Sequence, residues 1–178
     1  MKNYDLYSHT PVYTVKELLS FCVSEYGEKE AFAYQNRKQD ISISFSRLKK
    51  EVDALGSYLF HEGFKHSHIA VFGENSYEWI LTHFSVTCGG NVIVPIDKEL
   101  DADSISELLI DSESYLLVYS NTYADIVEQL QGKIPNIKYT SKEVVSSSNN
   151  VVELKMDANI LNAITKNGEK IKIAETIN

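Results

Sequence analysis

The alternation of short apolar runs with amphipathic segments constrains the fold of this chain more than any other feature. Three runs of five or six residues are nearly continuously apolar, and a shorter fourth follows them. They are His68–Phe72, Asn91–Ile96, Tyr115–Tyr119 and Asn136–Tyr139. Strands that are apolar throughout, rather than at every second residue, are typical of a parallel sheet buried on both faces. The pattern therefore predicts an α/β fold.

The segments between these runs have helical periodicity. One helix should follow Ser44 and bury Leu48 to Leu59 on one face, and another should follow His68–Phe72 with Asn75 as its cap. Ser104 and Glu107 have capping-box spacing and should open a further helix. Asp101 and Asp103 fit the negative bias of a helix start. The last predicted helix of the alternation is Asn121–Leu130.

The chain begins and ends differently. Thr14 and Glu17 also have capping-box spacing, so we expect an N-terminal helix that Gly27 stops. Ala31–Tyr34 and Ile41–Phe45 read as a β-hairpin. At the other end, we expect strands at Val151–Leu154 and Glu169–Ala174 with a short helix, Asp157–Thr165, between them.

Together these elements predict a three-layer, doubly wound α/β fold. A mostly parallel sheet should carry helices on both faces, with the N-terminal helix and hairpin attached. We expect one domain over residues 1–178, since this length is ordinary for a single domain.

Charge and composition exclude several classes of protein. The net charge of −8 disfavours nucleic acid and anionic membrane surfaces, because both would repel the chain. No stretch reaches the roughly 18 apolar residues of a membrane span, and residues 1–10 do not resemble a signal peptide. Cys22 and Cys88 read as buried thiols in a reducing compartment, so we expect a cytoplasmic protein.

Phosphate-binding motifs are missing from the sequence. It contains neither a G-x-G turn nor a G-x-x-x-x-G-K-[ST] loop. After His68–Phe72 the chain offers Gly73-Glu74-Asn75, which has one glycine and one carboxylate. A carboxylate there would repel phosphate, although it could bind a ribose hydroxyl. We therefore expect no nucleotide site at this loop.

Other candidate residues also have plain explanations. His61, His66 and His68 lack the i, i+4 spacing of a helical metal pair and read as solvated histidines. Ser46 and Lys49 match a two-residue nucleophile pattern without any supporting base motif. His83 shares an apolar helix face with Trp79 and Phe84, so it reads as a satisfied core histidine. The run Asp97-Lys98-Glu99 reads as a solvated turn. The residues thus predict no catalytic, cofactor-binding or metal-binding group.

Two segments nevertheless resemble the adenylate-forming enzymes. They are GENSYEW at Gly73–Trp79 and GGNVIVPID at Gly89–Asp97. Ile43–Leu48, Ala54–Leu59 and Asp111–Ser120 also resemble family segments in the family's order. The resemblance runs from about Tyr13 to Ser120. In detail, these segments are most similar to those of bacterial long-chain fatty-acid–CoA ligases.

The resemblance implies a ligase that uses ATP, magnesium and coenzyme A. A carboxylate, such as a fatty acid, would form an acyl-adenylate and then an acyl-CoA thioester. Residues 1–178 resemble the N-terminal lobe only, and nothing in them matches the family's phosphate loop, ribose acid or catalytic lysine. We therefore expect this lobe to be inactive alone, and the remainder of the ligase to be its partner. Gly89, Gly90, Pro95 and Asp97 should have structural roles, Asp97 as a helix cap.

Two alternatives remain at this stage. The lobe could be a stand-alone binding or interaction domain. A receiver-like switch is the weaker alternative, because Glu74 and Asp97 follow strands but no matching lysine does.

Overall fold

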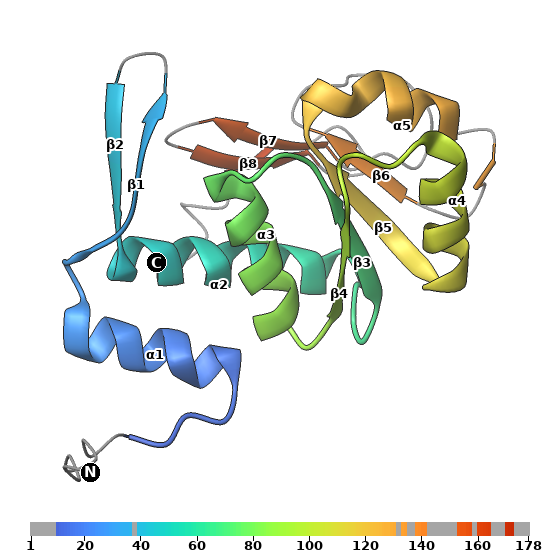
Figure 1. The fold of residues 1–178 in the computed structure, drawn as a ribbon. Helices are drawn as coiled ribbons and strands as arrows, with labels where there is room; N and C mark the ends of the chain where they lie inside the picture. Colours follow the sequence, from blue (N-terminus) through green and yellow to red (C-terminus); the bar gives the residue numbers. More distant parts are fainter. Residues whose placement is uncertain are drawn as a thin grey trace, which may run out of the picture.

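The central element of the fold is a four-stranded parallel sheet. The computed structural model describes the backbone of residues 10–36, 39–130, 133–134, 138–141, 153–157, 160–164 and 170–172. The sheet consists of β3 (His68–Phe72), β4 (Val92–Ile96), β5 (Ser114–Tyr119) and β6 (Lys138–Ser141). Their order is β4-β3-β5-β6, and every neighbouring pair is parallel. The predicted parallel sheet is confirmed (Figure 1).

Helices cover both faces of this sheet. On one face lie α1 (Val15–Tyr26), α2 (Phe45–His61) and α3 (Tyr77–Cys88). On the other lie α4 (Ala102–Asp111) and α5 (Ala124–Leu130), which follows the short 3₁₀ helix η1 (Asn121–Tyr123). Figure 1 shows the three layers, with α4 and α5 on the far side of the strands from α2. The predicted three-layer architecture is confirmed.

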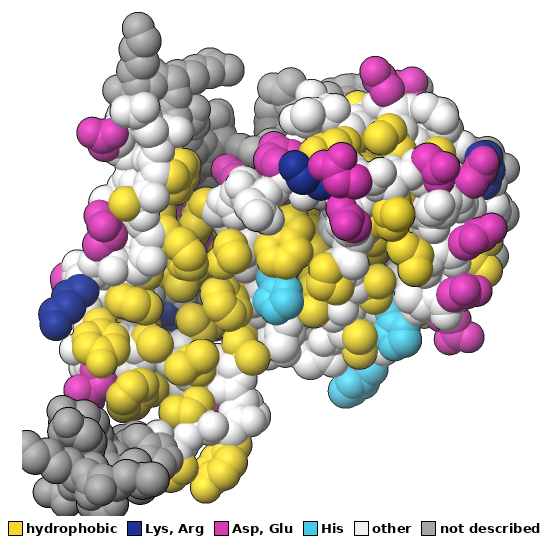
Figure 2. All heavy atoms as spheres, viewed as in Figure 1, with side chains coloured by type: hydrophobic (Ala, Val, Ile, Leu, Met, Phe, Trp, Pro, Cys, Tyr) yellow, Lys and Arg dark blue, Asp and Glu magenta, His cyan; other side chains and the backbone are white. Residues whose placement is uncertain are grey.

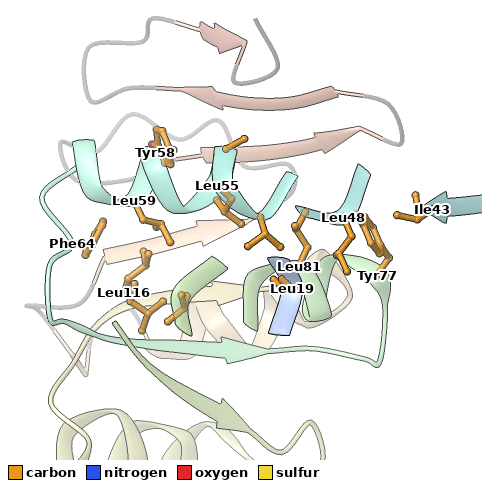
Figure 3. Packing of buried hydrophobic residues seen from close by; sticks show 14 residues of the cluster. Leu19, Ile43, Leu48, Leu55, Tyr58, Leu59, Phe64, Tyr77, Leu81 and Leu116 are labelled. Atoms are coloured by element: carbon orange, nitrogen blue, oxygen red, sulfur yellow. The ribbon is translucent and has the colours of Figure 1, made fainter. Parts of the chain in front are cut away.

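Strands β3, β4 and β5 are largely apolar because each of them contributes to two cores. Ile69 of β3 and Leu116 of β5 are paired in register and face the core under α1, α2 and α3. Their successors, Ala70 and Leu117, point the other way, into the core under α4 and α5. Figure 3 shows the first core, where leucines of α2 meet Leu81 of α3.

Helix caps explain where the helices begin. Thr14 accepts a hydrogen bond from Glu17 N and α1 has the complete capping box, as predicted. Two other predicted caps are wrong. Ser76, not Asn75, is the extended residue whose hydroxyl accepts from the backbone of α3. Asp101 caps α4, so Ser104 lies inside the first turn and donates its own N–H to Asp101.

The predicted hairpin is present and longer than expected. Strands β1 (Glu30–Asn36) and β2 (Gln39–Ser44) pair antiparallel, with an irregularity between Glu30 and Phe32. Tyr34 of the hairpin stacks on Tyr77 at 6.0 Å between ring centres. This contact ties the hairpin to the first residue of α3.

The C-terminal segment differs from the prediction. Strands β7 (Glu153–Asp157), β8 (Ile160–Ile164) and β9 (Lys170–Lys172) form an antiparallel sheet. The strands predicted at Val151–Leu154 and Glu169–Ala174 are confirmed in part, because residues 151–152, 169 and 173–174 lie outside the described residues. The predicted helix Asp157–Thr165 is wrong. The backbone of β8 pairs with β7 on one side and with β9 on the other, and this pairing satisfies backbone groups that a short isolated helix would leave partly unpaired.

Candidate functional site

The strand order determines where a ligand site is expected. From β3 the chain passes through α3 to β4 on one side, then through α4 to β5 on the other side of β3. The carboxyl ends of β3 and β5 therefore lie at a point where the connections diverge to opposite faces. In open α/β sheets, ligands bind in the crevice at such a point. The candidate site is thus the edge formed by residues 73–76 and 120–122.

A carboxylate and a hydroxyl meet at this edge. Ser120 Oγ donates to Glu74 Oε1 at 2.9 Å, and Ser120 N donates to Phe72 O at the same distance. The second carboxylate oxygen, Glu74 Oε2, is buried and has no hydrogen-bond partner among the described residues. Glu74 is thus held in one orientation with one acceptor still available.

Gly73 allows a close approach of the two loops at this edge. A Cβ atom at Gly73 would lie 3.0 Å from Ser120 Cβ and 3.4 Å from Ser120 N. The loop after β3 therefore presses against the end of β5. A side chain at residue 73 would require Ser120 to move by a few tenths of an ångström.

The charge at this edge is predominantly negative. Besides Glu74, it carries Glu78 in the first turn of α3, Asp97 after β4, and Asp101 at the start of α4. The hydrogen bond from Ser104 N lowers the pKa of Asp101 below its usual value. The carboxylates would repel a triphosphate, so the described residues of this edge do not fit ATP.

A partly buried polar network lies beside the start of α3. Tyr77 donates its hydroxyl to Glu51 Oε2 at 2.7 Å, and Arg47 Nε donates to Glu51 Oε1 at 2.6 Å. Burial, and then the hydrogen bond to Glu51, raises the pKa of Tyr77 well above its usual value. The network joins α2 to α3 and to the hairpin, so it positions the first turn of α3 and carries no chemistry.

The structure does not bring the three histidines of the sequence together as metal ligands. His68 Nδ1 lies within hydrogen-bonding distance of Ser112 O, His61 ends α2, and His66 lies in the loop with a positive φ of 52°. Among the residues that the structure describes, no group of three His, Cys, Asp or Glu side chains could hold a metal ion. The interpretation of His68 as solvated is wrong, because its ring is half-buried against the Ser112 carbonyl.

His83 is half-buried on α3. It stacks on Trp79 at 5.4 Å between ring centres, but its Nδ1 has no hydrogen-bond partner within the described ranges. The packing of His83 against Trp79 was predicted. The prediction that the hydrogen-bonding groups of His83 are satisfied is wrong for Nδ1.

Ser46 and Lys49 do not form a catalytic pair. Ser46 N donates to Gly27 O, and Lys49 pairs with Asp53 instead of Ser46. Cys22 and Cys88 are free, as predicted, but half-buried and not fully buried.

The segments that carried the family resemblance have structural roles. A Cβ atom at Gly89 would lie 2.9 Å from Ser85 O, so the end of α3 requires a glycine there. Pro95 lies on β4, at the edge of the sheet, where its missing N–H is tolerated. Asp97 accepts from Glu99 N in an exposed turn, as the sequence predicted for this run. It does not cap α4, so the expected cap role at Asp97 is wrong.

Sequence reasoning missed the contact between Glu74 and Ser120 and the network at Glu51. Glu74 and Ser120 are 46 residues apart, and nothing local connects them. The spacing of Arg47 and Glu51, four residues apart on one helix, was a signal that could have been used.

Comparison of this chain with known proteins gives its protein family. A family profile described as AMP-binding enzyme matches residues 21–172. The mitochondrial medium-chain acyl-CoA ligase of Homo sapiens is 25% identical over 129 residues, which are 69% of this chain and 21% of that protein. The corresponding protein of Rattus norvegicus is 28% identical over 103 residues, which are 57% of this chain and 16% of that protein.

Solved structures agree at the level of the fold. A fatty acyl CoA synthetase of Mycobacterium tuberculosis superposes with a TM-score of 0.66 at 15% identity, covering 90% of this chain and 34% of that chain. An acetoacetyl-CoA synthetase of Streptomyces lividans superposes with a TM-score of 0.67 at 12% identity, covering 79% of this chain and 24% of that chain.

This chain belongs to the AMP-binding enzyme family, the adenylate-forming enzymes that include acyl-CoA ligases. It spans about a fifth of the length of the curated relatives that it matches. The predicted family is confirmed.

Proposed function

We propose that this chain is the N-terminal part of an ATP-dependent fatty-acid–CoA ligase. The observation that carries the proposal is the family match over residues 21–172, which includes the whole described parallel sheet. In the complete enzyme, a fatty-acid carboxylate would attack the α-phosphate of ATP, and coenzyme A would then displace AMP. ATP, magnesium and coenzyme A would bind elsewhere in the enzyme.

The chemistry of the carboxyl edge supports the proposal that this part alone does not catalyse adenylation. Phosphate sites at such edges use glycine-rich backbone amides and cationic side chains. Here Gly73 packs against Ser120, and Trp79 N already donates a hydrogen bond to the Ser76 hydroxyl. Lys98, in the turn after β4, pairs with Glu99. The edge is therefore a scaffold for another part of the enzyme.

The substrate proposal is a long-chain fatty acid, with a medium-chain fatty acid as the alternative. The long-chain proposal rests on the resemblance of residues 73–79 and 89–97. The named curated relatives, which are medium-chain ligases, support the alternative. Palmitate and octanoate therefore serve as the two test substrates.

The test is ATP–pyrophosphate exchange driven by each fatty acid. Residues 1–178 should show exchange at background with both acids. Exchange above background that depends on added fatty acid would overturn the proposed inactivity. It would leave the family assignment intact.

The partner in this proposal is the remainder of the ligase. Figure 2 shows hydrophobic side chains gathered at the surface over α1, α3 and the hairpin. Large exposed apolar patches mark interaction sites, which also favours the second candidate function, a stand-alone interaction domain. Purification with a separate protein that lacks an adenylation domain would favour that second candidate.

For the location we propose the cytosol. Two free, half-buried thiols on different helices support a reducing compartment. Among the described residues, no helix has the length and hydropathy needed to cross a bilayer. Cell fractionation with an antibody against the chain tests the proposal, and recovery in a membrane-enclosed organelle or the secreted fraction contradicts it.

A further inference from the structure

A cavity of about 520 Å³ lies between α1, α2 and α3. Its walls include Lys16, Val52, Gly56, Phe60, Cys88 and Gly89. It lies at the C-terminal end of α3, whereas the carboxyl edge lies at the N-terminal end. A helix of 12 residues is about 18 Å long, so the cavity is separate from the candidate site described above.

The shape of the cavity depends on the close crossing of α2 and α3. A Cβ atom at Gly56 would lie 3.4 Å from Ser85 O, so the two helices are nearly in contact there. The absence of a side chain at Gly56 leaves space above this crossing. Val52 and Phe60, one turn before and after it, provide apolar walls. Its volume lies in the range of small-molecule sites.

Phe60 is a large apolar residue that is nevertheless 54% exposed. Lys65 Nζ lies 3.9 Å from the centre of its ring. The ring therefore combines an apolar surface with a nearby positive charge, and an apolar group in the cavity would bury more of it.

The charged groups around the cavity have an excess of positive charge. Lys49 and Asp53 form an ion pair at 2.5 Å. Lys16 makes no ion pair with any residue in the part of the chain that the structure describes. His61 is exposed at the rim. Asp53 is the carboxylate at this cavity and is paired with Lys49, so the ammonium of Lys16 is available to an anion.

Cys88 also lines the cavity, but its thiol is poorly suited to covalent chemistry. Burial raises its pKa, Asp53 raises it further, and Lys49 and Lys16 act in the opposite direction. The thiol is protonated at neutral pH, so it is a weak nucleophile. A ligand here would be held without a covalent bond.

We propose that this cavity binds a small amphiphile with a single anionic head group. Lys16 Nζ serves as counter-ion to the head group, and Val52 and Phe60 contact the apolar body. The head group can be a carboxylate or a phosphate monoester, since both present oxygens to an ammonium. The proposal does not depend on adenylation activity, because none of these residues lies at the carboxyl edge.

The test is an NMR titration of ¹⁵N-labelled protein, residues 1–178, with octanoate and separately with octyl phosphate, below micelle-forming concentrations. Octanol and octylamine are the neutral and cationic comparison probes. Saturable amide shifts should be confined to the surroundings of Lys16, Gly56 and Cys88 for the two anions. The tighter-binding anion identifies the head group.

Variants make the test specific. Lys16→Gln should weaken anion binding about threefold to fivefold, as expected for loss of one partly exposed charge. The matched control Lys50→Gln removes an equal charge from the exposed side of α2, outside the cavity, and should leave binding unchanged. Ser57→Phe fills the cavity at an exposed lining position and should abolish binding while the other amide signals stay in place.

Three outcomes would overturn the proposal. Octanol or octylamine could bind as tightly as the anions, which would show a merely apolar or non-selective surface. Lys16→Gln and Lys50→Gln could weaken binding equally, which would show a general charge effect. Shifts that do not saturate, or that centre on Trp79 and Phe84, would place binding outside the cavity.

Discussion

Replacing Ser120 by alanine tests the contact that holds the carboxyl edge together. The substitution removes the donor to Glu74 Oε1 and leaves neither carboxylate oxygen with a described protein partner, since Oε2 already has none. A hydrogen bond to a charged group contributes about 1.5–3 kcal/mol, and an unsatisfied buried acceptor costs a similar amount. We expect Ser120→Ala to lower the free energy of unfolding by about 2 kcal/mol. For a chain of this length, the melting temperature should fall by roughly 4–8 °C.

A double-mutant cycle with Glu74→Gln measures how much the negative charge of Glu74 adds to this hydrogen bond. The glutamine amide keeps an acceptor for Ser120 and removes the buried charge, so Glu74→Gln alone should cost less, under about 1 kcal/mol. The coupling energy between the two substitutions should be about 1 kcal/mol. The cycle separates this energy from the weaker bond of Thr122 N to Ser120 Oγ, which Ser120→Ala also removes.

The assay is urea unfolding followed by circular dichroism, with Ser57→Ala as the matched control. Ser57 is an exposed helix residue, so its variant should stay within about 0.5 kcal/mol of the parent. A coupling energy indistinguishable from zero would refute the reasoning. So would a Ser120→Ala variant as stable as Ser57→Ala, because the contact would then contribute nothing to the edge.

Three further predictions concern the core and the titrating groups. Leu81→Ala, at a side chain that is 1% exposed, should cost about 2–5 kcal/mol in urea unfolding, whereas the control Leu108→Ala, at 42% exposure, should cost under about 1 kcal/mol. The pKa of Asp101 is lowered in the folded state, so the stability that its ionised carboxylate contributes is present above the usual carboxyl pKa. That contribution is lost as the pH falls through the pKa of the folded state, so Asp101→Asn should flatten this part of the acid unfolding profile. Tyr77 has a raised pKa, so its stabilisation is present below the usual tyrosine pKa of about 10 and declines above it; Tyr77→Phe should show a smaller alkaline decline. Steeper profiles in either variant would contradict these assignments.

The parallel sheet could be predicted because its signal is local. Each strand is buried on two faces, so His68–Phe72 and Ser114–Tyr119 are apolar along their whole length. The N-terminal helix could be predicted for a similar reason, because Thr14 and Glu17 are three residues apart and satisfy each other. In both cases the sequence contains the complete physical cause.

Features that depend on distant partners could not be predicted. Ile160–Ile164 forms a strand because it pairs with Glu153–Asp157, and that pairing outweighs its weak helical pattern. Glu74 and Ser120 meet only because β3 and β5 are neighbours in the sheet, although β4 lies between them in sequence. The candidate edge thus follows from topology, and the sequence alone indicated only that Glu74 follows a strand.

The central claim is that these residues form the N-terminal part of an adenylate-forming acyl-CoA ligase. The most direct measurement is fatty-acid-dependent ATP–pyrophosphate exchange by the product of the complete reading frame, with residues 1–178 measured beside it. The account predicts exchange by the complete product with palmitate or octanoate, and background exchange by residues 1–178. A complete product that exchanges pyrophosphate with neither acid, or with no carboxylate at all, would contradict it.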